Sequence, residues 1–203
     1  FEMNMGIRPG ERVLVFSDII GKNEHVGEAD RDRRLRLHAV ARQAAAFAQA
    51  AWGRGTFVEF PATAASGVEP PQPLWCATFG DAAVAELEKA GLLARLLDKS
   101  ALVADVDRAR EIVVSRKEDA ADIIIAMSNN STSHTRYRAL ACATGTRFAS
   151  LPHFDPDMFH SSMTVDWKAL AERTAHLVEA VNAAEWIRVT TPNGTDMQIC
   201  KLG

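Results

Sequence analysis

The chain has 203 residues, of which 47% are hydrophobic, and its formal net charge is −3. This length and apolar content are enough for one sizeable hydrophobic core, or for a domain plus a fragment of another, and they argue against a disordered chain. The slightly acidic balance, with an isoelectric point near 6.1, creates no overall field that would attract nucleic acid. We therefore expect a globular protein without a nucleic-acid partner.

The cysteines Cys76, Cys142 and Cys200 are widely spaced and form no CxxC pair, so they indicate neither a zinc site nor a redox dithiol. No apolar run approaches the roughly 20 residues that cross a bilayer. The first residues also lack the basic-then-apolar pattern of a signal peptide. We predict a cytoplasmic protein with no membrane partner. Because the sequence begins with Phe1, we expect the natural protein to extend further at its N-terminus.

The first part of the chain predicts a strand, a helix and a second strand. Residues 12–16 form a short apolar run typical of a buried strand that ends at Ser17 and Asp18. Residues 30–52 are rich in alanine and predict a long helix, after which residues 56–60 predict the second strand. The expected apolar stripe of the helix consists of Leu37, Val40, Ala44, Phe47 and Ala51.

The middle of the chain predicts a helical crossover. The proline-rich residues 62–73 predict an irregular connection. Residues 81–98 and 105–116 each predict one amphipathic helix, and residues 123–125 predict a third, buried strand. The whole connection is longer than the usual crossover between two parallel strands.

The last part of the chain predicts two further helices, a strand and a hairpin. Residues 133–144 predict a short helix that is closed by Gly145, and residues 146–150 predict a fourth strand. Asp166 is expected to cap a helix that runs through residue 182. Asn193-Gly194 separates the apolar runs 186–190 and 197–202, which is a strong hairpin signal.

Together these elements predict an α/β fold: a three-layer αβα sandwich with a mainly parallel sheet, followed by a terminal β-hairpin. Apolar strands that alternate with helices must be covered on both faces, which favours this arrangement. The hairpin breaks the alternation and resembles the beginning of another domain. We predict an N-terminal α/β domain over residues 1–184 and the start of a truncated C-terminal domain over residues 185–203.

Polar residues follow the third strand directly and precede a predicted helix. Ligands of parallel α/β sheets bind at the carboxyl ends of the strands, where helix N-termini also point. This position predicts a cleft lined by Ser131, Ser133, His134, Thr135 and Arg136, together with Asp18 at the end of the first strand.

Each of these residues also has a structural interpretation. His134 is either an acid, base or substrate partner in the cleft, or a residue that helps to cap the following helix. Ser131 and Ser133 are interpreted as helix N-caps rather than nucleophiles, because no Gly-x-Ser-x-Gly motif surrounds them. Arg136 holds a carboxylate or pairs with a neighbouring domain. Asp18 alternatively accepts hydrogen bonds from nearby backbone N–H groups.

Two other polar clusters are present. The loop from His153 to His160 contains two imidazoles and two carboxylates, but its spacing fits no standard metal site, and Asp155-Pro156-Asp157 favours a turn and a short helix at Met158. No phosphate-binding glycine motif follows the first strand, so no nucleotide site is indicated. The basic cluster Arg31, Arg33, Arg34 and Arg36 alternates with Asp30 and Asp32 and is interpreted as a solvated helix face.

Five segments occur in order along the chain: Ile7-Arg-Pro-Gly-Glu-Arg-Val-Leu-Val15, Asp122-Ile-Ile-Ile-Ala-Met127, Ser131-Thr-Ser-His-Thr135, Thr146-Arg-Phe-Ala-Ser-Leu-Pro152 and Val189-Thr-Thr-Pro-Asn-Gly-Thr-Asp196. This ordered set resembles the N-terminal domain of the aminopeptidase T and aminopeptidase S type of metallopeptidase, which includes leucyl aminopeptidases. The superfamily also contains the 2,5-dihydroxypyridine dioxygenases. The resemblance covers nearly the whole chain.

The resemblance implies a metal-dependent aminopeptidase-like hydrolase whose metal ligands lie in a C-terminal domain outside this chain. The implied cofactors of the full-length protein are divalent zinc, cobalt, manganese or magnesium ions, or ferrous iron if the chemistry is that of the ring-cleaving dioxygenases. No cofactor and no hydrolase activity are expected for these 203 residues alone. His134 would contact substrate or relay a proton without being a metal ligand.

The expected partners are a peptide or small-molecule substrate and a second copy of the chain in a homodimer. The long helical insert from Trp75 to Arg116 indicates that the substrate preference differs from that of the named peptidases. A non-catalytic interaction domain is the alternative from another functional class.

Overall fold

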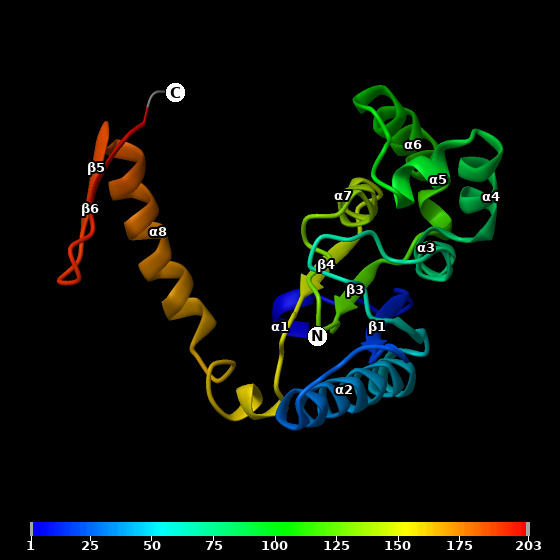
Figure 1. Cartoon of the computed structure of the whole chain (residues 1–203), viewed down its shortest axis with the longest axis horizontal. Coiled ribbons are helices and arrows are strands. Elements are labelled where there is room, and N and C mark those ends of the chain that lie inside the picture. Colours follow the sequence, from blue (N-terminus) through cyan, green and yellow to red (C-terminus); the bar gives the residue numbers. More distant parts are fainter. Residues whose placement is uncertain (1, 202–203) are drawn as a thin grey trace. The chain divides into compact units, whose positions relative to one another are not determined.

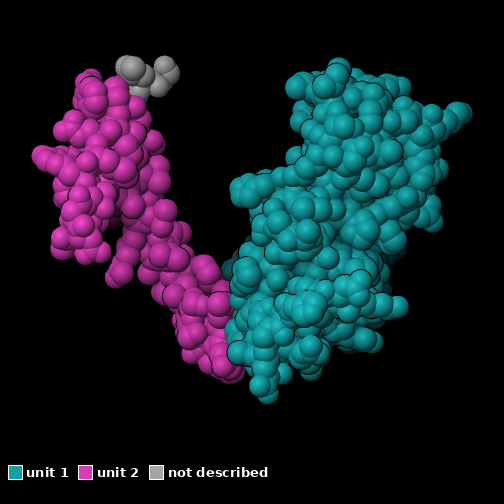
Figure 2. All heavy atoms as spheres, viewed as in Figure 1, with its two compact units in different colours: residues 1–156 teal, residues 157–203 magenta. Residues whose placement is uncertain are grey.

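The computed structural model describes residues 2–201, apart from the side chain of Met3. The chain divides into two compact units, Phe1–Pro156 (unit 1) and Asp157–Gly203 (unit 2), which Figure 2 shows in different colours. Unit 1 contains a parallel sheet flanked by helices, and unit 2 contains a helix and an antiparallel hairpin. The predicted α/β fold with a terminal hairpin is confirmed. The predicted domain boundary at residue 184 stays a prediction.

Unit 1 is built on a four-stranded parallel sheet with the strand order β2-β1-β3-β4. The strands are β1 (Val13–Ile19), β2 (Gly55–Pro61), β3 (Ile123–Ala126) and β4 (Arg147–Ser150). The helices are α1 (Glu2–Met5), α2 (Glu28–Trp52), α3 (Gln72–Phe79), α4 (Asp81–Lys89), α5 (Leu92–Leu97), α6 (Val103–Ser115) and α7 (Arg136–Ala143), with a short 3-10 helix at Lys117–Asp119.

The two faces of the sheet are covered by different helices, because successive side chains of a strand point to opposite faces. Leu14, Phe16 and Ile124 belong to a core that is shared with helices α3 to α7. The alternate residues of the same strands, such as Val13 and Val15, are also buried, and α2 packs against β1 and β2. Figure 1 shows α2 on one side of the sheet and helices α3 to α7 on the other.

The aromatic core places α7 over the sheet. Tyr137 is fully buried, and its ring lies 5.6 Å from that of Trp75 and 6.3 Å from that of Phe16. The Tyr137 hydroxyl is 2.6 Å from Thr78 Oγ1, so its polar end is satisfied inside the core. Burial also raises the pKa of Tyr137 far above its usual range, which keeps the phenol neutral. The N-terminus of α7 is therefore fixed by packing directly behind it.

Helix α2 lies very close to the sheet, and its buried stripe differs from the predicted one. An added Cβ on Gly55 would lie 2.3 Å from the Ala45 carbonyl oxygen and 2.4 Å from the Gln49 nitrogen. Small side chains allow this approach, whereas Phe47 of the predicted stripe is exposed. The residues that α2 buries are Arg34, Leu37, Ala41, Ala45 and Ala48.

Several predicted element boundaries need correction. The predicted helix over residues 81–98 is two helices, α4 and α5, because Gly91 adopts a left-handed conformation with φ 67° between them. The predicted connection over residues 62–73 ends at residue 71, where α3 begins with a proline in its first turn. Strand β1 runs past Ser17 to Ile19, so Asp18 lies within the strand.

Unit 2 consists of η2 (Pro156–His160), which spans the division between the units, α8 (Trp167–Ala183), β5 (Trp186–Thr190) and β6 (Asp196–Cys200). Asp166 caps α8 as predicted, because its Oδ1 accepts hydrogen bonds at 3.0 Å from the backbone N–H groups of Lys168 and Ala169. The hairpin is also confirmed, although Leu202, the predicted last strand residue, lies outside the described residues. No residue between 157 and 201 is buried. The described hydrophobic core thus belongs to unit 1.

Candidate functional site

The strand order of the sheet reverses direction between β1 and β3. From β1 the chain passes to β2 on one side, and it later enters β3 on the other side of β1. The carboxyl ends of two such strands, and the loops that leave them in opposite directions, form the usual ligand crevice of open α/β sheets. Here these positions carry Asp18 on β1 and the loop of residues 127–135 after β3.

Asp18 links the two strand ends and keeps one oxygen unpaired. Its Oδ1 accepts a hydrogen bond of 2.8 Å from the backbone N–H of Asn129, as the structural interpretation of this residue predicted. Its Oδ2 is buried and has no hydrogen-bond partner among the described residues. Only 3% of Asp18 is exposed, and this burial raises the pKa of its carboxyl group. Asp18 thus has both a structural contact and a free acceptor.

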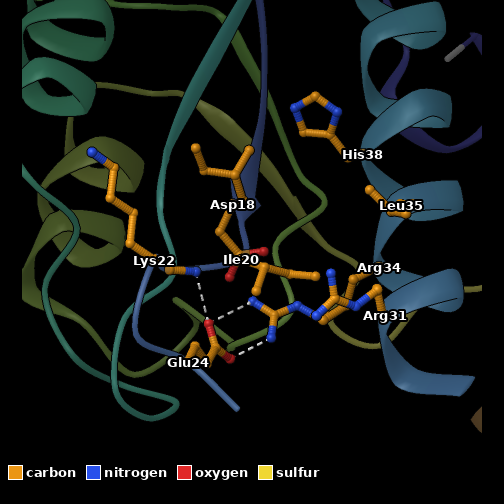
Figure 3. Close-up of a pocket in the computed structure, with 10 residues that line it drawn as sticks. Asp18, Ile20, Lys22, Glu24, Arg31, Arg34, Leu35 and His38 are labelled. Carbon is orange, nitrogen blue, oxygen red and sulfur yellow. Dashed lines mark hydrogen bonds and ion pairs between the residues drawn. The ribbon is translucent and has the colours of Figure 1, made fainter. Parts of the chain in front are cut away.

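Asp18 lines a cavity of about 440 Å³ between the end of β1, the following loop and α2. Figure 3 shows the residues from α2, including Arg31, Arg34 and His38, beside Asp18 and the loop residues. A cavity of this size holds a small organic molecule.

Arg34 is the buried cation of this cavity. Its guanidinium forms a paired contact with the Glu24 carboxylate, in which Nη1 donates to Oε1 and Nη2 donates to Oε2 at 3.3 Å. The hydrogen bond from Arg34 is the main reason why the pKa of Glu24 is lowered, so Glu24 stays ionised. Only 3% of Arg34 is exposed. The Arg34 Nε–H group takes part in neither of these contacts.

The interpretation of the basic cluster as a solvated face is therefore wrong for part of it. Arg34 is buried, and the neighbouring Arg33 is only partly exposed because it donates to Asp30 and Asn129. The signal that could have identified Arg34 is its spacing from Leu37 and Ala41, which places all three on one helix face. Glu24 carried no sequence signal, because its loop has no regular spacing.

The segment from Ser131 to Arg136 is held by the connection between β2 and α3. Gly67 N–H donates to the Ser131 carbonyl at 2.7 Å, and Ser131 N–H donates to Ser66 Oγ at 3.0 Å. The buried Glu69 accepts hydrogen bonds from the backbone N–H groups of Arg136 and Tyr137, at 2.7 and 3.0 Å. The segment is thus fixed from both ends.

The predicted caps of the following helix need correction. Helix α7 begins at Arg136, three residues later than expected, and Thr135 is its N-cap through a 3.1 Å hydrogen bond from Arg138 N–H. Ser131 and Ser133 bond to each other instead, because Ser133 N–H donates to Ser131 Oγ at 3.2 Å. Glu69 supplies the second acceptor of the helix N-terminus, from a position that sequence spacing did not reveal.

His134 differs from its neighbours because its side chain is exposed. No hydrogen bond or ion pair joins its ring to any other described residue, and its Cβ lies close to Gly67. Arg136, in contrast, donates from Nη2 to the Ala101 carbonyl at 2.9 Å, within its own unit. Among residues 2–201, no hydrogen bond or ion pair joins Asp18 to the Ser131–Arg136 segment. The predicted cleft residues therefore lie at neighbouring strand ends but have separate contacts.

The loop from His153 to His160 does not gather metal ligands. Asp155 Oδ2 accepts a hydrogen bond of 2.7 Å from Arg36, and residues 156–160 form a short 3-10 helix. In the part of the chain that the structure describes, no three His, Cys, Asp or Glu residues come together in a group that could hold a metal ion.

Two further findings concern membrane-spanning helices and similarity to known proteins. No helix within residues 2–201 is long and apolar enough to cross a membrane. Comparison with protein-family models, curated proteins and solved structures gives no match.

Proposed function

We propose that this chain is the substrate-cleft domain of a metal-dependent aminopeptidase-like hydrolase that acts on a peptide or small-molecule substrate. The observation that carries the proposal is the reversal of strand order between β1 and β3, with Asp18 and the loop bearing His134 at the two strand ends. The ordered sequence segments that resemble such peptidases support the same class.

His134 is the proposed catalytic residue. The backbone around it is held by Glu69, Gly67 and Ser66, whereas its own ring remains exposed and without a described partner. A fixed backbone with a free imidazole suits proton transfer or hydrogen bonding to a bound substrate. Ser131, Ser133, Thr135 and Arg136 position this residue through the contacts described above.

The described residues do not fit a metal centre, because no group of three suitable side chains comes together among them. Divalent ions held elsewhere in the full-length protein would activate the attacking water, as the resemblance implies. Under this proposal, the chain contributes the opposite wall of the cleft.

The test is turnover by the full-length protein before and after removal of bound metal by a chelator. We expect hydrolysis of aminoacyl anilides to disappear on chelation and to return with zinc, cobalt, manganese or magnesium. Ring opening of 2,5-dihydroxypyridine that requires ferrous iron would contradict the hydrolase and indicate the dioxygenase. The absence of metal-dependent turnover on both kinds of substrate would indicate a non-catalytic interaction domain.

A further inference from the structure

Two buried side chains of the cavity beside β1 each keep a polar atom without a partner. These atoms are Asp18 Oδ2 and Arg34 Nε, and no described residue bonds to either of them. Most buried polar atoms of folded proteins do have a partner, and an unpaired one is a reason to look for a missing ligand. Both residues line the same cavity.

The charges around the cavity favour an anionic group. Glu24 is already paired with the terminal nitrogens of Arg34, so these two charges compensate each other. Arg31 also lines the cavity from α2, its side chain is exposed, and no described residue forms an ion pair with it. Lys22 adds a second cation from the loop after β1. A bound carboxylate would therefore find uncompensated positive charge.

The cavity also has an apolar side. Ile19 and Leu35 line it and are 40% and 59% exposed. Ile20 also lines the cavity. A short apolar group on the ligand would cover this surface, since removal of apolar area from water is favourable.

We propose that this cavity binds a small carboxylate that carries a hydrogen-bond donor on the adjacent carbon and a short apolar side chain. The carboxylate lies toward Arg31 and the Arg34 Nε–H group, and the donor bonds to Asp18 Oδ2. Hydroxy carboxylates and amino carboxylates share this chemistry. The site shares Asp18 with the proposed hydrolase cleft, but it involves neither His134 nor a metal, so a direct binding measurement tests it independently of turnover.

The experiment is calorimetric titration of the 203-residue chain with four compounds that share one apolar body. L-leucine and L-2-hydroxy-4-methylpentanoate have both groups, 4-methylpentanoate lacks the donor, and L-leucinamide lacks the carboxylate. We expect at least one of the first two to bind, and each deleted group to weaken binding by about tenfold or more. The better of the first two identifies the donor as ammonium or hydroxyl.

Variants then locate the site. Asp18→Asn keeps an oxygen for Asn129 N–H but places an NH₂ group where the ligand donor must bond, so we expect binding to weaken by about tenfold or more. Arg31→Gln changes an exposed residue and should also weaken binding, whatever the effect of Asp18→Asn on folding. Arg110→Gln, an exposed arginine of α6 outside the cavity, is the matched control and should bind as the parent does.

Three results would overturn the proposal. The first is that none of the four compounds binds, which would mean that the cavity holds only water. The second is that all four bind equally. The third is that Arg31→Gln and Arg110→Gln bind the best compound as tightly as the parent protein.

Discussion

At the scale of single residues, two buried carboxylates connect segments at the carboxyl end of the sheet. Glu69 joins the connection after β2 to the first N–H groups of α7, and Asp18 joins β1 to the loop after β3. Burial raises the pKa of both groups, because the ionised form loses its hydration. Each of them therefore makes the stability of the fold depend on pH.

Glu69 allows a direct test of this dependence. At a pH below its ordinary pKa of 4.5, Glu69 is protonated in both the folded and the unfolded chain. Its contribution to the free energy of unfolding is then fully present. As the pH rises through the raised folded pKa, the unfolded chain releases the proton more readily, and this stability is lost. Glu69→Gln does not titrate, so we expect the variant to gain stability relative to the parent between pH 4 and pH 7.

The measurement is the free energy of unfolding in urea of both proteins at the two pH values. Glu111→Gln, on the exposed face of α6, is the control and should show a much smaller change with pH. If the parent instead gains stability relative to Glu69→Gln between pH 4 and pH 7, the account is contradicted. The hydrogen bonds from the N–H groups of Arg136 and Tyr137 would then stabilise the ionised Glu69 carboxylate more than burial destabilises it.

At the scale of secondary-structure elements, α2 approaches β2 very closely at Gly55. The atoms that an added Cβ on Gly55 would meet are backbone atoms of α2, which cannot rotate away. We expect Gly55→Ala to lower the free energy of unfolding by about 1–3 kcal/mol, the usual cost of overpacking. Thermal or urea unfolding of the variant checks this value.

Gly27 supplies a control of opposite sign on the same helix. It is the N-cap residue of α2, has a β-region backbone and provides no side-chain acceptor, and an added Cβ would meet nothing within 4 Å. Gly27→Ser should therefore raise stability by about a few tenths of a kcal/mol. Equal stability of Gly55→Ala and the parent would contradict the close approach.

The elements also show what the sequence could reveal and what it could not. The strands, the Asp166 cap and the Asn193-Gly194 hairpin were predictable because their signals are local. The break at Gly91 and the buried stripe of α2 were missed, because alanine-rich helices permit several apolar faces and the close contact at Gly55 selects one of them. Glu69 and Glu24 were missed because their partners are distant or lie across an irregular loop.

The candidate site was predictable by position but not by contact. Asp18 and the loop with His134 were expected at strand ends, and the strand order places β1 beside β3. The burial of Arg34 was not expected, because mixed charge usually indicates a solvated helix face. Its role depends on how α2 is rotated against the sheet, which only packing decides.

At the scale of the whole molecule, the two units differ in kind. Unit 1 has a continuous core, whereas residues 157–201 include no buried side chain, and large apolar residues such as Leu177 and Trp186 are exposed. Unit 1 therefore provides the rigid part on which a cleft can be built. The proposal assigns its function to the strand ends of this unit, with His134 as the residue that meets the substrate.

The most direct test of this assignment is turnover and metal content of the full-length protein carrying His134→Ala. We expect turnover of the best substrate to fall by about a hundredfold or more, the usual contribution of a general acid or base, while the bound metal stays unchanged. His25→Ala, which changes another exposed histidine of unit 1, should alter neither quantity. Undiminished turnover of His134→Ala, or loss of bound metal in parallel with turnover, would contradict a catalytic wall without metal ligands.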